Sequence, residues 1–277
     1  MLFALSFWIC RLQFAALVGS ALIGISATAQ DLGAKEMVQR AIEVNERDWD
    51  TAPGYDYFHR ERDGEHSKTY EAIMLAGSRY DRLVAIDDKP LSADDEAKEE
   101  HRLQQAVAER QQEDPDERQK RVGGYQKEIN RDHVLMRESI KALEFTLAEQ
   151  ETLGDRKVFV LKGTPRLGYR PPNKQSRALT GMQGTLWIDA SDFHWVKAEA
   201  EVVRPVWIYG FLARIEPGTH FELDQAPIGD GVWMPNHFIM DAKAKVFLLF
   251  PRYERDDITY FNYHKPNPSP TNAENGK

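Results

Sequence analysis

The sequence has a single cysteine, Cys10, among its 277 residues. One thiol cannot form a disulfide within the chain, and it cannot build a zinc site that needs several cysteines. If the protein works in an oxidising compartment, its fold must therefore be stable through packing alone.

Basic residues are also scarce relative to acidic ones. The chain holds 36 Lys or Arg against 44 Asp or Glu, which gives a formal net charge of −8. A general nucleic-acid binder needs a basic face to meet the phosphates, so we expect no nucleic-acid partner. The apolar share of 42% and the charged share of 29% are typical of a globular protein.

The common catalytic motifs are missing as well. The sequence contains no G-x-S-x-G elbow, P-loop, dinucleotide fingerprint or H-E-x-x-H pair. His220, Glu222 and Asp224 alternate along one predicted strand, and His237 follows a Trp-Met-Pro turn. Such groups can serve a metal or a proton relay, but we favour a polar, solvent-facing strand for the first three and a hydrogen-bonded strand histidine for His237. We expect no enzyme activity, no metal site and no cofactor.

The longest apolar run lies at the start of the chain. Residues 1–29 carry one charge, Arg11, and end in Ala-Thr-Ala at 27–29, the small-x-small pattern that a signal peptidase accepts. We therefore predict a signal peptide over 1–29, cleaved before Gln30, and an exported protein. The alternative is that the segment is retained as a membrane anchor, because its full length could span a bilayer.

The region after this leader predicts one helix and a meander of strands. Residues 31–48 place apolar side chains at helical spacing, with Asp31 as a possible N-cap. From residue 55 to residue 86 the period changes to two, with a hairpin signal at Asp63-Gly64 and a second turn at Gly77-Ser78. This pattern predicts three antiparallel strands.

The segment 92–141 is strongly charged and predicts two helices. Ser92 can cap a first helix whose opening turns are acidic, and Asp114-Pro115 marks a break before the second helix. Apolar positions in the second helix are sparse. We interpret the segment as a solvated helical hairpin that lies over the sheet, with a mobile lid as the alternative.

Beyond residue 142 the alternation of a sheet returns. The predicted strands are 143–149, 156–163, 182–189, 193–204, 206–216, 219–225, 231–241, 242–250 and 255–263. The interval 164–181 is too rich in proline and glycine for a strand, and the proline-rich tail 265–277 is predicted to be disordered.

These elements predict a mainly β fold with some α-helix. The long helical crossovers that parallel strands need are absent, which favours sequential antiparallel strands. We predict an unclosed antiparallel β-barrel, or half-barrel, in a single domain over 30–264. One N-terminal helix packs inside its concave face, and a helical hairpin is inserted at about 92–141.

Several strands have apolar faces that are partly built from small side chains. Such a face can allow close packing of a helix, or it can leave unfilled volume that accepts an apolar ligand. The candidate ligand-binding residues are Leu186, Ile188, Val196, Ala198, Trp207 and Phe211.

Three short motifs resemble a known family. Residues 184–189 read Gly-Thr-Leu-Trp-Ile-Asp, 196–199 read Val-Lys-Ala-Glu, and 231–235 read Gly-Val-Trp-Met-Pro. This order is similar to the outer-membrane lipoprotein-sorting (LolA/LolB-like) families of Gram-negative bacteria, over about 182–241. The resemblance implies an open periplasmic barrel whose concave apolar face, covered by helices, takes up acyl chains. It also implies that the hairpin at 92–141 is an elaboration.

The sequence thus leads to three functional hypotheses, of which the weakest is a hydrolase that uses the carboxylates at 220–224 or His237. The first is a non-enzymatic periplasmic carrier that binds an acyl lipid or a lipoprotein. The second is an envelope sensor or scaffold that uses the 92–141 hairpin to bind a protein partner.

Overall fold

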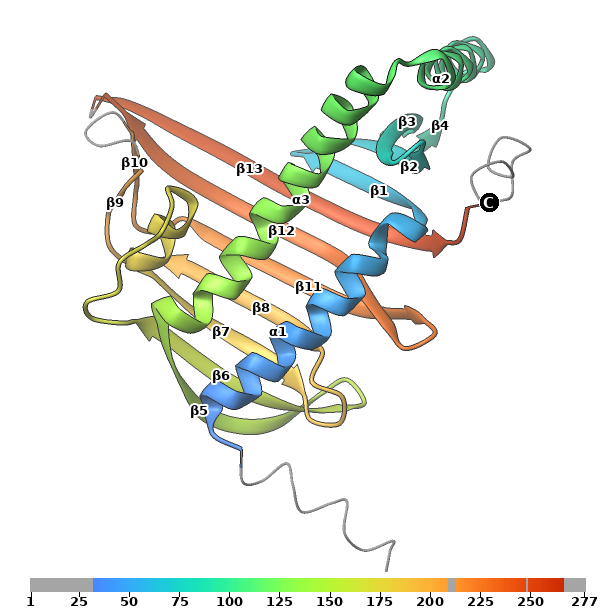
Figure 1. The fold of residues 1–277 in the computed structure, drawn as a ribbon. Helices are drawn as coiled ribbons and strands as arrows, with labels where there is room; N and C mark the ends of the chain where they lie inside the picture. Colours follow the sequence, from blue (N-terminus) through green and yellow to red (C-terminus); the bar gives the residue numbers. More distant parts are fainter. Residues whose placement is uncertain (1–31, 209–212, 248, 267–277) are drawn as a thin grey trace, which may run out of the picture.

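The computed structural model describes residues 32–208, 213–247 and 249–266. One large antiparallel sheet dominates these residues, with α1 and α3 on one side of it and α2 at one end (Figure 1). The helices are α1 (Ala34–Thr51), α2 (Ala93–Gln112) and α3 (Pro115–Ala142), with short 3₁₀ helices η1 (Ala52–Gly54) and η2 (Gln175–Gly181).

The strands are β1 (Asp56–Asp63), β2 (His66–Leu75), β3 (Ser78–Ile86), β4 (Lys89–Pro90), β5 (Leu143–Leu153), β6 (Arg156–Pro165), β7 (Met182–Asp189), β8 (Trp195–Val202), β9 (Val206–Trp207), β10 (Ala213–Ile215), β11 (His220–Gly229), β12 (Val232–Val246) and β13 (Phe250–His264). Most strands follow one another along the chain in short connections, but α2 and α3 lie between β4 and β5, and a long loop with η2 lies between β6 and β7.

The strand order is β4-β3-β2-β1-β13-β12-β11-β8-β7-β6-β5, with β10 attached to β12 and β9 to β10. The first meander therefore pairs with the last long strand, where Phe58 lies opposite Phe261 and His59 opposite Tyr260. β4 and β5 lie at the two ends of this order, so the sheet stays unclosed. The predicted open antiparallel half-barrel is confirmed.

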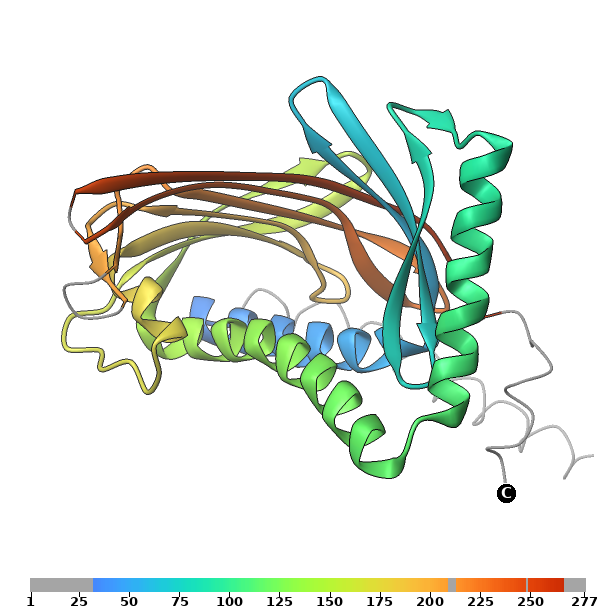
Figure 2. The ribbon, with the colours of Figure 1, turned by 90° about the horizontal axis from the view of Figure 1, so that it is seen from above.

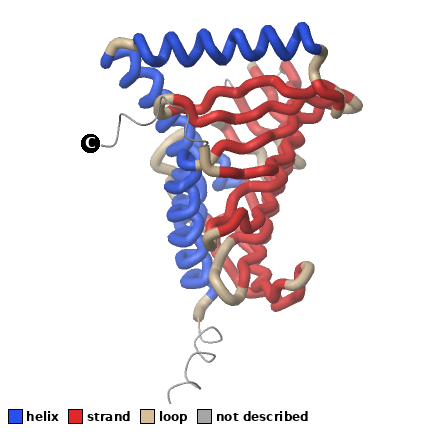
Figure 3. The backbone as a smooth tube through the Cα atoms, turned by 90° about the vertical axis from the view of Figure 1, so that its right-hand side faces the viewer, coloured by secondary structure: helices blue, strands red, loops and turns tan. Residues whose placement is uncertain are grey.

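Two helices, rather than the predicted one, cover the concave face. Figure 2 shows α1 and α3 side by side beneath the curved sheet, while α2 stands beside β3 at one end. An ion pair joins Arg137 of α3 to Glu46 of α1, and the rings of Trp49 and His133 stack with centroids 4.6 Å apart. In Figure 3 α1 and α3 form a layer next to the strands, while α2 runs across one end of the sheet.

The space under the N-terminal half of α1 is filled by side chains. The predicted apolar stripe of this helix is confirmed, because its members are buried against β6, β7 and β8 together with a residue of α3. This core cluster consists of Met37, Val38, Ala41, Ile42, Met136, Phe159, Leu161, Leu186, Ile188 and Trp195. Ile140 of α3 packs against it. The second helix of the predicted hairpin thus belongs to the core, which the resemblance did not imply.

Asp48, near the C-terminal end of α1, fixes the helix to two distant parts of the sheet. Its buried carboxylate accepts the backbone N–H of Trp233 at 3.1 Å and lies 3.0 Å from Nε2 of His194. The His194 ring in turn stacks on the indole of Trp233. Helix α1 is therefore held against the sheet by specific polar contacts as well as by apolar packing.

Some element boundaries differ from those the sequence predicts. Residues 231–241 and 242–250 were expected as two strands, but β12 runs through them, because the chain keeps pairing with β13 from His237 to Val246. The expected strand 206–216 is instead a small pair, in which Arg214 of β10 lies opposite Trp207 of β9. The N-cap of α1 is Gly33, and the proposed cap Asp31 lies outside the described residues.

Other boundaries agree with the sequence. Ser92 caps α2 through its side chain, and Asp114 caps α3, with Pro115 at the first helical position. The predicted leader over 1–29 and the tail beyond residue 266 lie outside the described residues. Within the described part of the chain, no helix is both long and apolar enough to cross a membrane.

Candidate functional site

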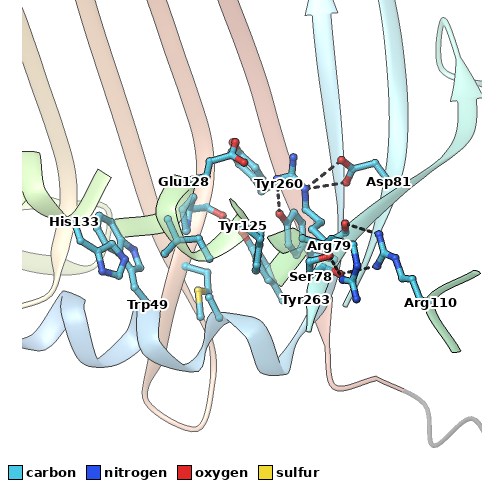
Figure 4. A pocket seen from close by; sticks show the side chains of 16 residues that line it. Trp49, Ser78, Arg79, Asp81, Arg110, Tyr125, Glu128, His133, Tyr260 and Tyr263 are labelled. Atoms are coloured by element: carbon cyan, nitrogen blue, oxygen red, sulfur yellow. Dashed lines mark hydrogen bonds and ion pairs between the residues drawn. The ribbon is translucent and has the colours of Figure 1, made fainter. Parts of the chain in front are cut away.

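A cavity of about 510 Å³ lies between the C-terminal end of α1, the first half of α3 and the strands β1, β3, β12 and β13. Its size falls in the range of about 300–1,000 Å³ that small-molecule sites occupy. Figure 4 shows its side chains converging from these elements. Its walls include Trp49, Tyr57, Arg79, Tyr125, Tyr260 and Tyr263.

Tyrosine rings form much of the cavity wall. Tyr57 stacks on Tyr263 with ring centroids 5.1 Å apart, and it lies 6.1 Å from the ring of Tyr260. Burial raises the pKa of both Tyr260 and Tyr263, with the neighbouring Tyr57 adding to the effect. These hydroxyls therefore stay neutral at physiological pH, and the rings present a mainly apolar surface with polar tips.

Arg79 supplies the central charge of the cavity. Its Nε lies 3.1 Å from the carboxylate of Asp81, and its Nη1 donates to the hydroxyl of Tyr57 at 3.3 Å. Burial works to lower the pKa of Arg79, but Tyr57 and Asp81 outweigh it and raise that pKa. The guanidinium is thus a permanent cation at the edge of a cavity that is lined by aromatic rings.

Two arginines from the helical hairpin, Arg110 (Figure 4) and Arg121, line the cavity at the β2–β3 turn. Arg110 of α2 donates to the backbone carbonyls of Leu75 at 2.7 Å and Ser78 at 3.0 Å. Arg121 of α3 donates to the hydroxyl of Ser78 at 2.6 Å and pairs with Glu113 at 2.6 Å. These bonds attach the hairpin to the sheet and leave their donors largely occupied.

His59 lies behind the cavity wall. Its ring is buried and packs edge-on against Tyr57 and Tyr70, and its Nε2 is 3.8 Å from Asp81. Burial lowers the pKa of His59, and the attraction of Asp81 only partly opposes this. Neutral His59 therefore adjoins the Asp81 carboxylate that holds Arg79.

The six residues predicted to bind ligand lie apart from this cavity or outside the described part. Leu186 and Ile188 are in the filled core cluster, and Ala198 packs against it. Val196 is half-buried near the register shift between β7 and β8. Trp207 is 38% exposed on β9, with the guanidinium of Arg214 over its ring. Phe211 lies outside the described residues.

The polar groups considered as a metal site are engaged in cross-strand ion pairs. Lys197 lies 2.8 Å from Glu222, and His237 lies 3.0 Å from Asp257. His220 is 3.8 Å from Glu222. In the described residues no group of three or more His, Cys, Asp or Glu side chains is arranged to hold a metal ion.

Sequence reasoning missed Arg79 and the tyrosines as site residues. Alternation places Tyr260 and Tyr263 on opposite faces of a strand, because they are three positions apart. A register shift between Asp56 and Phe58 of β1 adds one residue on β13, and Asn262 there has a φ of 53°. The bulge turns both tyrosines toward the cavity. Asparagine tolerates this left-handed conformation better than most residues, so Asn262 was the available sequence signal for the bulge.

Comparison with known proteins gives structural matches alone. No family model matches the chain, and no curated protein matches its sequence. The solved structures to which it is similar include a LolA superfamily protein from Nitrosomonas europaea, with 11% identity, a TM-score of 0.30, and coverage of 87% of this chain and 96% of that one.

Two further solved structures are similar to this chain. A candidate outer membrane lipoprotein-sorting protein domain from Vibrio parahaemolyticus has 9% identity, a TM-score of 0.33, and coverage of 84% of this chain and 94% of that one. A DUF1329 family protein from Desulfovibrio piger has 9% identity, a TM-score of 0.28, and coverage of 82% and 92%. The family named from the sequence motifs thus recurs among these matches. At such identities and TM-scores, the function of this chain must be argued from its own residues.

Proposed function

We propose that this chain is an exported, non-enzymatic carrier that binds acyl chains of a lipid or lipoprotein between its curved sheet and the helices α1 and α3. The observation that carries the proposal is the aromatic cavity beneath these helices. Its mixture of tyrosine rings with Trp49, Met234 and Ile129 suits a flexible apolar chain. The export signal predicted at residues 1–29 would place this carrier in the periplasm.

The driving force for binding is the removal of methylene groups from water. Each buried methylene contributes about 0.8 kcal/mol, so a segment of about eight gives roughly 6 kcal/mol before the cost of ordering the chain. That range supports reversible loading, which a carrier needs in order to release its cargo.

A longer ligand would need more room than the cavity offers. The core cluster adjoins it along α1, and displacement of that helix would uncover Leu186, Ile188 and the neighbouring Val196 and Ala198. We therefore retain these residues in the proposal as the wall for an extended chain. Trp207 and Phe211 also stay in the proposal, as contacts for the far end of the acyl chain. This assignment rests on the sequence pattern alone.

The proposal is tested by filling the cavity. Ala52 lines it, and an Ala52→Trp substitution should weaken binding of a labelled fatty acid by at least about tenfold, because the indole occupies the volume of the ligand. Ala108→Trp on the exposed side of α2 is the matched control and should leave binding unchanged. Fluorescence titration gives both affinities. Absence of binding to the unsubstituted protein, or equal binding by both variants, contradicts the proposal.

A second candidate function is an envelope sensor or scaffold. It is favoured by α2, of whose residues only Glu99 is buried, so that the helix offers a long, charged surface to a partner. Reversing the charge of Lys98 and Arg102 should then abolish capture of an envelope protein while fatty-acid binding persists. Loss of neither property argues against a partner on this helix.

A further inference from the structure

We propose that the cavity selects an amphiphile with an anionic end, a carboxylate or a phosphate, and that Arg79 is the residue that recognises this group. The inference rests on the proposed acyl-binding function and names the class of ligand. It arises from the way in which charged and aromatic side chains are divided within the cavity.

The charged end of the cavity is built around the β2–β3 turn. Three arginines reach it from three elements: Arg79 from β3, Arg110 from α2 and Arg121 from α3. The acidic side chains in the wall are Asp81 and Glu128. The described lining of this end thus holds three arginines and two carboxylates, and a third carboxylate, Glu113, pairs with Arg121.

The three arginines differ in what already occupies them. Arg121 is neutralised by Glu113 through contacts of Nε at 2.8 Å and Nη2 at 2.6 Å. Arg110 makes no ion pair within the described part of the chain, but three backbone carbonyls take its donors, the third being that of Arg79 at 3.3 Å. Both arginines are committed to holding the hairpin in place.

Arg79 is the arginine whose guanidinium keeps free Nη donors. Asp81 takes Nε, Tyr57 takes one donor of Nη1, and among the described residues Nη2 has no hydrogen-bond partner. The Arg79 side chain keeps 38% of its surface exposed, so a ligand in the cavity can reach it. Its remaining Nη donors match the planar geometry with which arginine holds a carboxylate or phosphate.

The rest of the cavity provides for an apolar tail. The stacked rings of Tyr57 and Tyr263, with Tyr260 beside them, lie next to Arg79, and Trp49 and Met234 continue the wall. A neutral hydrocarbon would leave the free Nη donors of Arg79 unpaired in this partly enclosed space, which costs free energy. An acidic head removes that cost while its chain lies against the rings.

Three probes of equal chain length separate the head from the tail: dodecanoate, dodecyl phosphate and 1-dodecanol. Isothermal titration at pH 8 should give at least one anion an affinity about tenfold or more above that of dodecanol. In the Arg79→Gln variant this preference should fall close to unity, with the affinity for dodecanol unchanged. Arg79→Lys keeps the charge without the planar fork and should retain part of the preference.

Arg62→Gln is the matched control, because Arg62 is an exposed arginine of β1 outside the cavity wall. It should leave all three affinities unchanged, and circular dichroism of each variant checks folding. The anion that is held more tightly identifies the head as carboxylate or phosphate.

Two outcomes overturn the inference in different ways. Equal binding of all three probes by the unsubstituted protein, or a preference that survives in Arg79→Gln, refutes anion recognition and leaves the acyl carrier intact. Failure of all three probes to bind removes the carrier and the anion site together.

Discussion

At the scale of single residues, His59 couples the stability of the protein to pH. It is buried beside Asp81 and among tyrosine rings, and burial lowers its pKa below the ordinary value of about 6.5. As the pH falls below about 6.5, the unfolded chain takes up a proton at this position before the folded protein does. The free energy of unfolding contributed by His59 is therefore complete above that pH and is lost toward the lowered pKa of the folded state.

A substitution isolates this effect. His59→Phe keeps an aromatic ring but cannot titrate, so the decline in the free energy of unfolding between pH 7.5 and pH 5 should become shallower, by about 1.4 kcal/mol for each unit of pKa shift. Urea unfolding at several pH values measures it. His101→Phe, at an exposed position of α2, should keep the slope of the unsubstituted protein. Identical slopes in all three proteins would show that His59 does not contribute.

Sequence patterns at this scale predict which residues face inward, but they do not predict which residues meet. The apolar stripe of α1 and the inward position of Ile188 follow from helical and strand periods, and both are observed in the core. The site depends on long-range register instead. Arg79 and Tyr263 line the same cavity only because β1 pairs with β13 and a bulge at Asn262 rotates the strand, and neither fact is local to a stretch of sequence.

At the scale of elements, Arg110 makes three hydrogen bonds that hold α2 to the sheet, beside the ion pair of Glu100 with Arg82 of β3. The Arg110 guanidinium binds the carbonyls of the β2–β3 turn, including that of Ser78 at 3.0 Å, whereas most of the helix faces solvent. Arg110→Ala should leave those carbonyls unsatisfied and release α2. Hydrogen exchange in 93–112 is expected to accelerate by about tenfold or more, while exchange in β12 stays unchanged.

The control for this prediction comes from the same helix. Arg102 pairs with Glu99 one turn away and contributes no bond to the sheet, so Arg102→Ala should leave the exchange of α2 nearly unchanged. Equal protection from hydrogen exchange in the Arg110 and Arg102 variants would mean that the Arg110 contacts do not hold the hairpin. A mobile lid would then have to be fixed by other contacts.

The prediction of elements from sequence succeeded where the signal was local. Most strands, the Ser92 cap of α2 and the break at Asp114-Pro115 were located, because alternation, Gly turns and capping residues act over a few positions. The role of α3 was missed for the opposite reason. Its inward contribution is carried by few side chains, chiefly Met136 and Ile140, in a helix otherwise dominated by charge, so the sequence resembles a solvated hairpin.

At the scale of the whole molecule, α2 and α3 connect the two opposite edges of the sheet. The strand order begins with β4 and ends with β5, and the helical segment 93–142 is the chain that joins them. The 28 residues of α3 alone span about 42 Å at about 1.5 Å for each residue. The segment is therefore the crossover of the fold. Its second helix, α3, also covers the concave face together with α1.

This topology predicts the result of replacing 93–141 by a flexible Gly/Ser linker of equal length. The linker can still reach from β4 to β5, but it removes Met136 and Ile140 from the core and uncovers the apolar concave face. We expect the cooperative unfolding transition to disappear and a hydrophobic dye to bind, because the loss in free energy of unfolding exceeds the usual stability of about 5–15 kcal/mol.

Met136→Ala alone should keep a cooperative transition and lose about 2–5 kcal/mol in the free energy of unfolding. Calorimetry and dye fluorescence compare the two variants. If the linker variant unfolded at the same midpoint as the unsubstituted protein, α2 and α3 would not be needed for stability. Deleting these helices could then separate acyl binding from partner binding.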